Sequence, residues 1–375
     1  MERYRRGVMM RVLRLAGTAH ERGVAYGEHT RDEIRECIQV YQRWFESFAN
    51  ISWPAARELG KPYRDWLCAT DPDLSEEIDG IAAGADLPVA DIIALNFRTE
   101  IAYGASGLMS ASECTSLGVP PVSTTNGHVY LAENWDWLAD TLPLTLMLEF
   151  EPVDGLRMVT VTEAGMVAKF GMNSDGVGLC VNLLGSNVNR VGGSFHTLAR
   201  GVLQSRSALE AVWSVTGSER GGSGNYVIGS SSGEIVDLEY SPSGYTLHFP
   251  DHGYVAHANH FLGKQAGVLD RTQILRNISP GSYFRQARAE HLLSDAVSST
   301  GINVKEIQSI LGDHQGEPEG ICRHGGPVGT HQVLGRTNVS VVMDLTDLTM
   351  YLGHGFGCSA AIEQYQLTAA QFSKV

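Results

Sequence analysis

Two neighbouring stretches of the sequence decide the fold: ECTSL at residues 113–117 and LAENWDW at residues 131–137. The first places Cys114 at the start of an apolar, strand-like run, and the second carries Asp136 on the expected returning strand. Between them lies Asn126-Gly127, and Asn-Gly flanked by strand-like sequence is a strong hairpin signal. The pattern therefore predicts a hairpin that brings a nucleophile close to a carboxylate that could orient it.

The turn also suggests a register for this hairpin. If Asn126 and Gly127 are its two loop residues, Asp136 faces Leu117, three positions from Cys114. At a rise of about 3.3 Å per residue, this separation is about 10 Å along the strand. Prolines at 120 and 121 interrupt regular pairing, so the sequence indicates the closeness of the two segments more firmly than their register.

Composition excludes several classes of function. The chain has 375 residues, of which 43% are hydrophobic and 19% charged, as expected for one large globular domain or two modest ones. A net charge of -14 argues against a nucleic-acid partner. The one basic cluster, at residues 3–14, lacks the apolar core of a secretory signal or membrane span. We interpret it as a solvated leader into the first strand, with an Arg-rich targeting arm as the alternative. The 6 cysteines are scattered without a CxxC pair, which favours a reducing compartment, so we expect a cytoplasmic protein without a membrane partner.

Residues 1 to about 110 have mainly helical patterns. A capping box, TAHE at 18–21, precedes apolar residues at helical spacing and predicts one long amphipathic helix over 22–48. Further helices are expected over 75–82 and 89–103.

From Cys114 onward the pattern changes to strands separated by Gly, Asn, Asp and Pro. Strands are predicted at 129–135, 144–150, 158–161, 177–183, 225–228, 234–240, 254–257, 338–344 and 349–352. Helices are predicted at 195–215, 283–297 and 304–311. Strands in runs, with helices grouped between them, favour the α+β class with packed sheets rather than a doubly wound parallel sheet.

Six short segments together carry a family resemblance. They are CTS at 114–116, ENWD at 133–136, TEAG at 162–165, GMNSDGV at 171–177, HANH at 257–260 and ICR at 321–323. In order and approximate spacing they resemble the isopenicillin-N acyltransferase family of N-terminal-nucleophile (Ntn) hydrolases, over about residues 15–355. The resemblance implies a four-layer αββα sandwich with a helical N-terminal segment, made as an inactive precursor that cleaves its own chain.

The resemblance places the cleavage between Glu113 and Cys114. It would give a mainly helical N-terminal segment, 1–113, and a catalytic segment, 114–375, which form one domain. We expect the two to remain associated, because the apolar helix face of the first would otherwise be exposed. The new α-amino group of Cys114, with a reference pKa of about 7.7–8.0, could take the thiol proton without a histidine. The family more often has glycine before the nucleophile, and the bulkier, charged Glu113 bears on the efficiency of cleavage.

The resemblance also assigns three supporting residues. Asp136 would orient the amine, Asn259 would donate to the tetrahedral oxyanion, and Arg323 would hold Asp136 or a substrate carboxylate. Four further candidates for contacting substrate are Thr115, Asn134, Trp137 and Lys169.

Structural roles are the alternatives for these residues. Asp136 could cap a turn, Asn259 could be a hydrogen-bonded loop residue, and Trp137 could simply pack. The cysteines other than Cys114 are expected to be small buried core residues: Cys37, Cys68, Cys180, Cys322 and Cys358. We expect no metal, because His257 and His260 have no third ligand at a suitable spacing. No cofactor is expected either, since the glycine spacing at 221–224 does not fit a dinucleotide site.

The sequence thus predicts a self-cleaving cysteine amidohydrolase or acyltransferase that acts on a small-molecule amide bond through an acyl-Cys114 thioester. One alternative is N-acyl transfer from a coenzyme A thioester. Others are a non-catalytic thiol or binding protein on the same scaffold, and a metallohydrolase that uses the histidines. The sequence specifies neither the substrate nor the oligomeric state.

Overall fold

The computed structural model describes residues 10–106, 114–151, 155–270, 280–299, 301–328, 331–333 and 335–367. The larger of its sheets has 8 strands, of which β1 and β4 pair in parallel and all other neighbours pair antiparallel. In spatial order its strands are β1 (Val12–Ala16), β4 (Thr145–Glu151), β5 (Met158–Glu163), β6 (Phe170–Asn173), β7 (Val177–Leu183), β8 (Gly224–Ser230), β9 (Ile235–Ser241) and β10 (Gly244–His248).

The second sheet has 6 strands and is antiparallel throughout. Its spatial order is β11 (Val255–His257), β2 (Thr115–Val119), β3 (Tyr130–Leu138), β14 (Gly335–Asp344), β15 (Thr349–His354) and β16 (Ile362–Gln366). A separate short pair joins β12 (Gly326–Val328) to β13 (His331–Val333).

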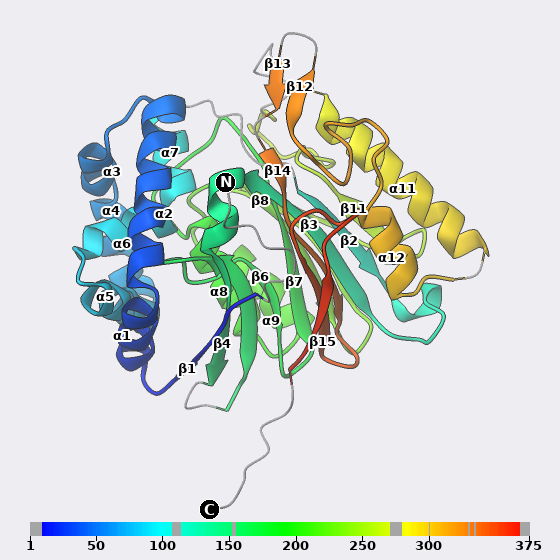
Figure 1. The fold of residues 1–375 in the computed structure, drawn as a ribbon, viewed down its shortest axis with the longest axis horizontal. Coiled ribbons are helices and arrows are strands. Elements are labelled where there is room, and N and C mark those ends of the chain that lie inside the picture. The colour runs from blue at the N-terminus through cyan, green and yellow to red at the C-terminus, as the bar shows by residue number, and fades with distance from the viewer. Residues whose placement is uncertain are drawn as a thin grey trace, which may run out of the picture.

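Helices cover the outer face of each sheet (Figure 1). Before β2 lie α1 (Ala19–His29), α2 (Arg31–Trp44), α3 (Trp53–Leu59), α4 (Lys61–Thr70), α5 (Pro72–Ala85), α6 (Val89–Asn96) and α7 (Arg98–Ser106). After β7 come α8 (Phe195–Leu203), α9 (Ala208–Thr216), α11 (Gly281–Ser299) and α12 (Val304–Leu311). α8 and α9 contact the larger sheet, α11 and α12 contact the smaller one, and β2 and β3 contact β7 and β8 across the interior. This αββα layering confirms the predicted fold class.

Strands between two layers are buried on both faces, and alternation assigns each side chain to one layer. Leu117 and Val119 of β2 pack in the core formed with the outer helices, whereas Cys114 belongs to the core that also contains the larger sheet. On β3, Trp135 and Trp137 lie in that same inter-sheet core. Cys114 therefore faces the space between the sheets. Within the described ranges, no helix is long and apolar enough to cross a membrane.

The helices are divided more finely than the periodicity predicted. The helix expected over 22–48 is two helices, α1 and α2, followed by a π-helical turn at Phe45–Ala49. The break lies at Thr30, whose hydroxyl donates to the carbonyl of Tyr26 at 2.7 Å. The helix expected over 195–215 is likewise two, α8 and α9, and the side chain of Ser207 caps the second. Short hydroxyl side chains that bond locally to the backbone favour such boundaries.

The predicted register of the β2–β3 hairpin was wrong. Thr115 pairs with Asn134, so Asp136 lies one position beyond the place opposite Cys114, and not opposite Leu117. The connection is longer than a two-residue turn, because a 3-10 turn occupies Pro121–Ser123. The hairpin signal gave the right pair of strands, and the prolines displaced the turn.

Candidate active site

Cys114 lies at the N-terminal end of β2 and is buried. Its side chain lines a pocket with an empty volume of about 300 Å³, part of which is open to solvent. The lining is largely aromatic and aliphatic, with two cationic side chains and one hydroxyl. Besides Cys114 it consists of Arg98, Thr99, Trp135, Trp137, Lys169, Val181, Leu183 and Phe195.

The thiol of Cys114 is held in its neutral form. Burial raises the pKa of Cys114 well above its ordinary value, and the nearby carboxylates of Glu133 and Asp136 raise it further. Glu133 is itself buried on β3 and accepts the backbone N–H of Val181 at 2.8 Å. Burial raises the pKa of Glu133 to about 8. Because the thiolate is the nucleophilic form, this cysteine needs a general base to react near neutral pH.

Asp136 is buried beside Cys114, and its two carboxylate oxygens differ. Its Oδ1 accepts the hydroxyl of Thr337 at 2.7 Å, whereas its Oδ2 has no hydrogen-bond partner among the described residues. Its backbone carbonyl lies 4.0 Å from the sulfur of Cys114. Burial raises the pKa of Asp136 well above its usual range, although the charge of Arg285 and the Thr337 hydroxyl oppose this shift. A buried, unpaired carboxylate oxygen is costly, so Oδ2 is suited to accept from an added donor.

Arg285, near the start of α11, is a site residue that the sequence reasoning missed. Its Nη1 donates to the backbone carbonyl of Cys114 at 2.6 Å and to the hydroxyl of Thr115 at 3.0 Å. Its Nη2 donates to Oδ1 of Asn259 at 3.1 Å. A signal was available, because residues 285, 289 and 293 are spaced by one helical turn and the last two are apolar. An arginine on the buried face of a predicted helix needs acceptors there.

Asn259 follows β11 and lies beside the same pocket. Its Nδ2 donates to the carbonyl of Leu183, a residue of the pocket wall, at 3.0 Å. Its backbone N–H donates to the hydroxyl of Ser282 at 2.8 Å. The structure thus brings Asn259 to Cys114 through Arg285.

Arg323 is connected to Asp136 through Thr337. The backbone N–H of Arg323 donates to the Thr337 hydroxyl at 2.9 Å, and that hydroxyl donates to Asp136. The Arg323 side chain donates from Nε to the carbonyl of Gly335 at 3.2 Å and lies 3.7 Å from Glu319. Burial lowers the pKa of Arg323 to about 9.

Two of the four substrate candidates line the pocket. Trp137 donates from Nε1 to the hydroxyl of Tyr41 at 2.7 Å. Lys169 lies 2.8 Å from Glu163 Oε2 and 3.6 Å from the ring centre of Trp135. Burial lowers the pKa of Lys169 to about 8, although Glu163 opposes this shift.

The other two candidates, Thr115 and Asn134, are not among the residues that line this pocket. Both are buried in the paired strands β2 and β3. Asn134 donates to the carbonyls of Leu311 and Ile321 at 2.7 and 2.8 Å, so it joins β3 to the α12 layer. Thr115 accepts from Arg285, which lies in the same layer. The structure therefore gives both side chains packing partners on the helix side of the sheet.

The cation Arg98, which the sequence reasoning also missed, faces the pocket from α7. Its guanidinium lies 3.4 Å from Glu163 and packs against the rings of Tyr41 and Trp137. Arg98 and Lys169 thus share one carboxylate. With Glu163 ionised, the three side chains carry a net positive charge next to Cys114.

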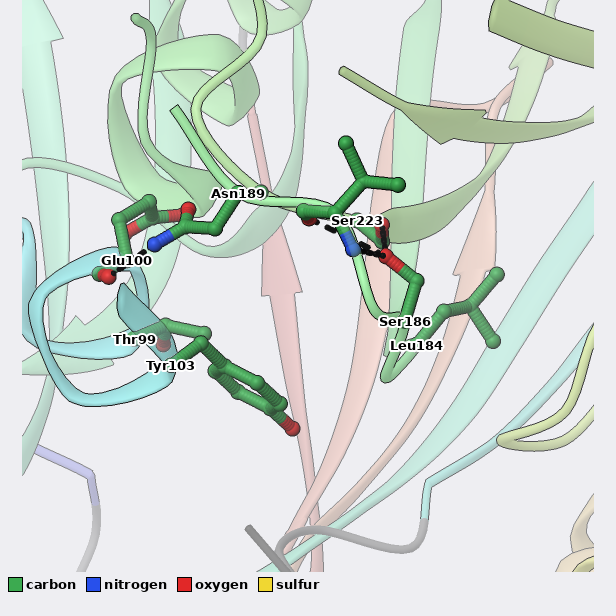
Figure 2. Close-up of a pocket in the computed structure, with 9 residues that line it drawn as sticks. Thr99, Glu100, Tyr103, Leu184, Ser186, Asn189 and Ser223 are labelled. Atoms are coloured by element: carbon green, nitrogen blue, oxygen red, sulfur yellow. Dashed lines mark hydrogen bonds between the residues drawn. The ribbon is translucent and has the colours of Figure 1, made fainter. Parts of the chain in front are cut away.

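A second, smaller pocket adjoins the first, since Thr99 lines both. Figure 2 shows its polar wall, where the side chain of Asn189 reaches toward Glu100 and Ser186 meets Ser223. Asn189 donates to the carbonyl of Glu100 at 2.7 Å, and the two serine hydroxyls lie 2.7 Å apart. Burial raises the pKa of Glu100 to about 7. A polar compartment thus lies beside the apolar one.

The structure also places the two histidines and the five other cysteines that the sequence singled out. His257 lies 3.0 Å from Glu239, and His260 lies 2.8 Å from the Ser282 hydroxyl, so each has an ordinary polar partner. Cys37, Cys180 and Cys322 are buried as predicted, but Cys68 and Cys358 are exposed, and that prediction was wrong. Cys68 lies on the exposed side of α4, next to the buried Leu67, and Cys358 lies between β15 and β16. Glu113 lies outside the described residues.

Comparisons with known proteins show which family the chain resembles. The family model described as acyl-coenzyme A:6-aminopenicillanic acid acyl-transferase matches residues 122–352. The 40 kDa form of the acyltransferase of that name from Emericella nidulans is 29% identical over 313 residues, which cover 82% of this chain and 83% of that protein.

Solved structures are also similar. Penicillin V acylase from Agrobacterium tumefaciens gives a TM-score of 0.48 at 15% identity, covering 68% of this chain and 86% of that one. A mutant conjugated bile acid hydrolase from Clostridium perfringens gives 0.45 at 11% identity, covering 68% and 97%. The family model spans more than half of the sequence and confirms the resemblance. The chain therefore belongs to the acyl-coenzyme A:6-aminopenicillanic acid acyl-transferase family.

Proposed function

We propose that this protein is a self-cleaving cysteine enzyme of the Ntn type, which cleaves or forms a small-molecule amide bond through an acyl-Cys114 thioester. The observation that supports it best is the position of Cys114. Its side chain borders a pocket between the two sheets, while Arg285 holds its carbonyl from the opposite side. A substrate in the pocket would meet the sulfur directly.

Activation would begin in the intact chain. The thiol of Cys114 would attack the carbonyl carbon of Glu113, so that a C–S bond forms and the C–N peptide bond breaks. The nitrogen takes the thiol proton and becomes a free α-amine. Water then hydrolyses the thioester and releases residues 1–113 and 114–375 as separate chains.

The free amine would supply the base that the buried thiol lacks. With a reference pKa of about 7.7–8.0, a useful fraction of the amine is neutral at physiological pH. We assign the unpartnered Oδ2 of Asp136 to the orientation of this amine, because the oxygen is buried next to Cys114 and needs a donor. The positive charge of Arg285 would stabilise the ionised form of Asp136.

Turnover would follow in two steps. The thiolate attacks the substrate carbonyl, and the Asn259 amide would donate to the oxyanion, for which it must give up part of its contact with Leu183. The intermediate collapses to a thioester as the amine product leaves with a proton. Water, or a second amine, then attacks the thioester and regenerates Cys114.

The pocket suggests which part of the substrate it takes. Trp135, Trp137 and Phe195 offer aromatic surface, so we assign an apolar acyl group to this compartment. Lys169 and Arg98 would favour an acyl group that also carries partial negative charge. The relative from Emericella nidulans is named acyl-coenzyme A:6-aminopenicillanic-acid-acyltransferase, which favours acyl transfer as the second candidate activity.

Location and assembly complete the proposal. All 6 cysteines are free thiols, which supports a reducing compartment and hence the cytoplasm. We propose that the segments 1–113 and 114–375 stay together after cleavage as parts of one domain.

The deciding experiment is the intact mass of the denatured protein, wild type beside Cys114→Ala. We expect the wild type to give two chains divided between Glu113 and Cys114, and the variant to give one. A single full-length chain in both proteins would remove the proposed base and favour a non-catalytic thiol or binding protein on the same scaffold instead. For the cleaved enzyme, release of free acid from acyl amides would mark a hydrolase, and product formation only with an added amine would mark an acyltransferase.

A further inference from the structure

Away from the pocket with Cys114, four metal-ligating side chains converge at one point. They are His314, Cys322, His324 and Cys358, and one ligand atom from each lies within 4.8 Å of the other three. They come from three separate parts of the chain. His314 follows α12, Cys322 and His324 precede β12, and Cys358 lies between β15 and β16.

The distances within this His2Cys2 cluster centre on His324. Its Nε2 lies 3.1 Å from Nε2 of His314, 3.6 Å from the sulfur of Cys322 and 3.4 Å from the sulfur of Cys358. An imidazole nitrogen carries either one proton or one lone pair, so it cannot make good hydrogen bonds to three partners at once. The convergence needs another explanation.

A tetrahedral zinc ion provides one. With Zn–N of about 2.0–2.1 Å and Zn–S of about 2.3 Å, the edges of the tetrahedron are about 3.3 Å between two nitrogens and about 3.6 Å between nitrogen and sulfur. The three distances above agree with these edges. We propose that the His2Cys2 cluster binds one structural Zn²⁺ through two imidazole nitrogens and two thiolates, and that the two thiol protons pass to solvent on binding.

The surroundings hold the ligands in place. The backbone N–H of Cys322 donates to the carbonyl of Asp313, the neighbour of His314, at 2.9 Å. The ring of Phe356 stacks on His324 with centres 3.9 Å apart and planes 20° apart. Cys322 is buried, whereas His314 and Cys358 are exposed, so an ion can reach the site from solvent. Four protein ligands leave no open position, which is typical of a structural zinc site and not of a catalytic one.

The site has a clear structural consequence. Arg323 lies between two of the ligands, and its backbone N–H donates to Thr337, which in turn donates to Asp136. A bound ion would fix this segment against α12 and against the turn after β15. The proposal is independent of whether Cys114 is a nucleophile, because it rests on the four ligands alone.

The test uses the full chain, purified without a metal-affinity tag, and measures metal content by mass spectrometry together with zinc affinity by competition with a chromophoric chelator. The variants are His314→Ala and Cys358→Ser, which change exposed side chains and should leave the fold intact. Matched controls are His291→Ala and Cys68→Ser, because these residues are also exposed but lie outside the cluster. We expect about one zinc per chain in the wild type and both controls. Zinc affinity should fall at least about tenfold in each cluster variant.

Cobalt gives an independent readout of geometry. In the wild type, added Co²⁺ should produce the visible absorption of a tetrahedral ion with thiolate ligands, and His314→Ala should lose it. Zinc binding that is equally tight in wild type and His314→Ala would overturn the proposal. So would a disulfide between Cys322 and Cys358 in protein purified under reducing conditions, since it would consume both thiolates.

Discussion

Arg285 and Asp136 are both buried near the start of β2, and the charge of Arg285 opposes the rise that burial causes in the pKa of Asp136. Arg285 donates to the carbonyl of Cys114, which fixes the backbone of the nucleophile. Its charge also lowers the cost of ionising Asp136, whose pKa burial would otherwise raise still further. At the scale of single residues, the candidate site is therefore set by a guanidinium that the family motifs did not point to.

Replacing Arg285 with glutamine should impair self-cleavage and activity together. The variant loses three donated hydrogen bonds and leaves Asp136 without its compensating charge. We expect the rate of appearance of the two chains, followed by intact mass, to fall at least about 100-fold, comparable to the loss of a donor that acts on a reacting group.

The control for this prediction is Arg288→Gln, one turn away on the same helix. Arg288 makes a bidentate pair with Asp313, at 3.1 and 2.8 Å, so its replacement also removes an arginine pair from α11 but not the contacts with Cys114 and Thr115. Cleavage at the wild-type rate in Arg285→Gln would show that the contact to Cys114 is only structural.

His257 predicts a pH dependence of stability. Burial alone would lower the pKa of His257, but Asp237 and Glu239 outweigh it and raise the pKa to about 9. The unfolded chain has a histidine pKa of about 6.5, so the folded state binds this proton more tightly. The resulting stabilisation is fully present below about pH 6.5 and is lost as pH rises through about 9.

This dependence can be measured by urea unfolding between pH 6 and 10. The Cys114→Ala background is suitable, because we expect it to remain one chain. The free energy of unfolding should fall more from pH 6 to pH 10 in the parent, which keeps His257, than in His257→Asn. The variant His252→Asn, which changes an exposed histidine, should follow the parent. Parallel curves for His257→Asn and its parent would contradict the shifted pKa.

At the scale of elements, the N-terminal helices pack unusually closely through glycines. An added Cβ at Gly27 of α1 would lie 2.2 Å from the carbonyl oxygen of Ile81 in α5, and one at Gly23 would lie 2.1 Å from that of Glu77. Glycines at 80 and 84 approach α1 in the same way from the other side. The two helices can touch backbone to backbone only because these positions have no side chain.

Gly27→Ala should therefore destabilise the protein. Its methyl group would meet backbone, which cannot move aside, and overpacking of this kind typically costs about 1–3 kcal/mol. Denaturant unfolding would measure the loss. Gly201→Ala in α8 is the matched control, because its nearest neighbour would be a serine oxygen at 3.5 Å. There we expect no loss or a gain of up to about 1 kcal/mol from helix propensity. Equal stabilities for the two variants would refute the close packing.

At the scale of the whole molecule, several contacts join the segments on either side of Cys114. Strand β1 from the first segment pairs with β4 of the second in the larger sheet. Glu77 of α5 accepts two hydrogen bonds from Arg200 of α8, at 3.0 and 2.8 Å, and all of these groups are buried. Cleavage before Cys114 would therefore leave these contacts intact.

We predict that the two cleaved chains elute together in native size-exclusion chromatography and separate only in denaturant. Glu77→Gln should weaken their association, since it leaves the charges of Arg22 and Arg200 buried without the carboxylate that pairs with both. Removing one member of a buried ion pair typically costs about 3–5 kcal/mol. As a control, Glu76→Gln changes the exposed residue next to Glu77 and should leave the association of the two chains unchanged. Separate elution of the wild-type chains would show that the segments do not form one domain.

Much of the fold could be predicted because it depends on local patterns. The apolar run at 177–183 coincides with β7, and the spacing at 304–311 coincides with α12. Periodicity reports which face of a strand or helix is buried, and it needs only neighbours along the chain. The sequence also brought Cys114 and Asp136 together, since the hairpin that joins them is short.

The tertiary structure decided what converges from distant parts of the chain. Arg285 reaches Cys114 across 171 positions, and Cys358 reaches His324 across 34. Loop lengths and the packing of layers fix such contacts, and no local period records them. By itself the sequence determined many of the strands and helices, the family resemblance and the nucleophile candidate, but it missed short elements such as β6, β10 and α3. Only the fold decided the register of the hairpin, the contact of the Arg285 guanidinium with Cys114, and the His2Cys2 cluster. Each depends on atoms brought together by packing rather than by proximity along the chain.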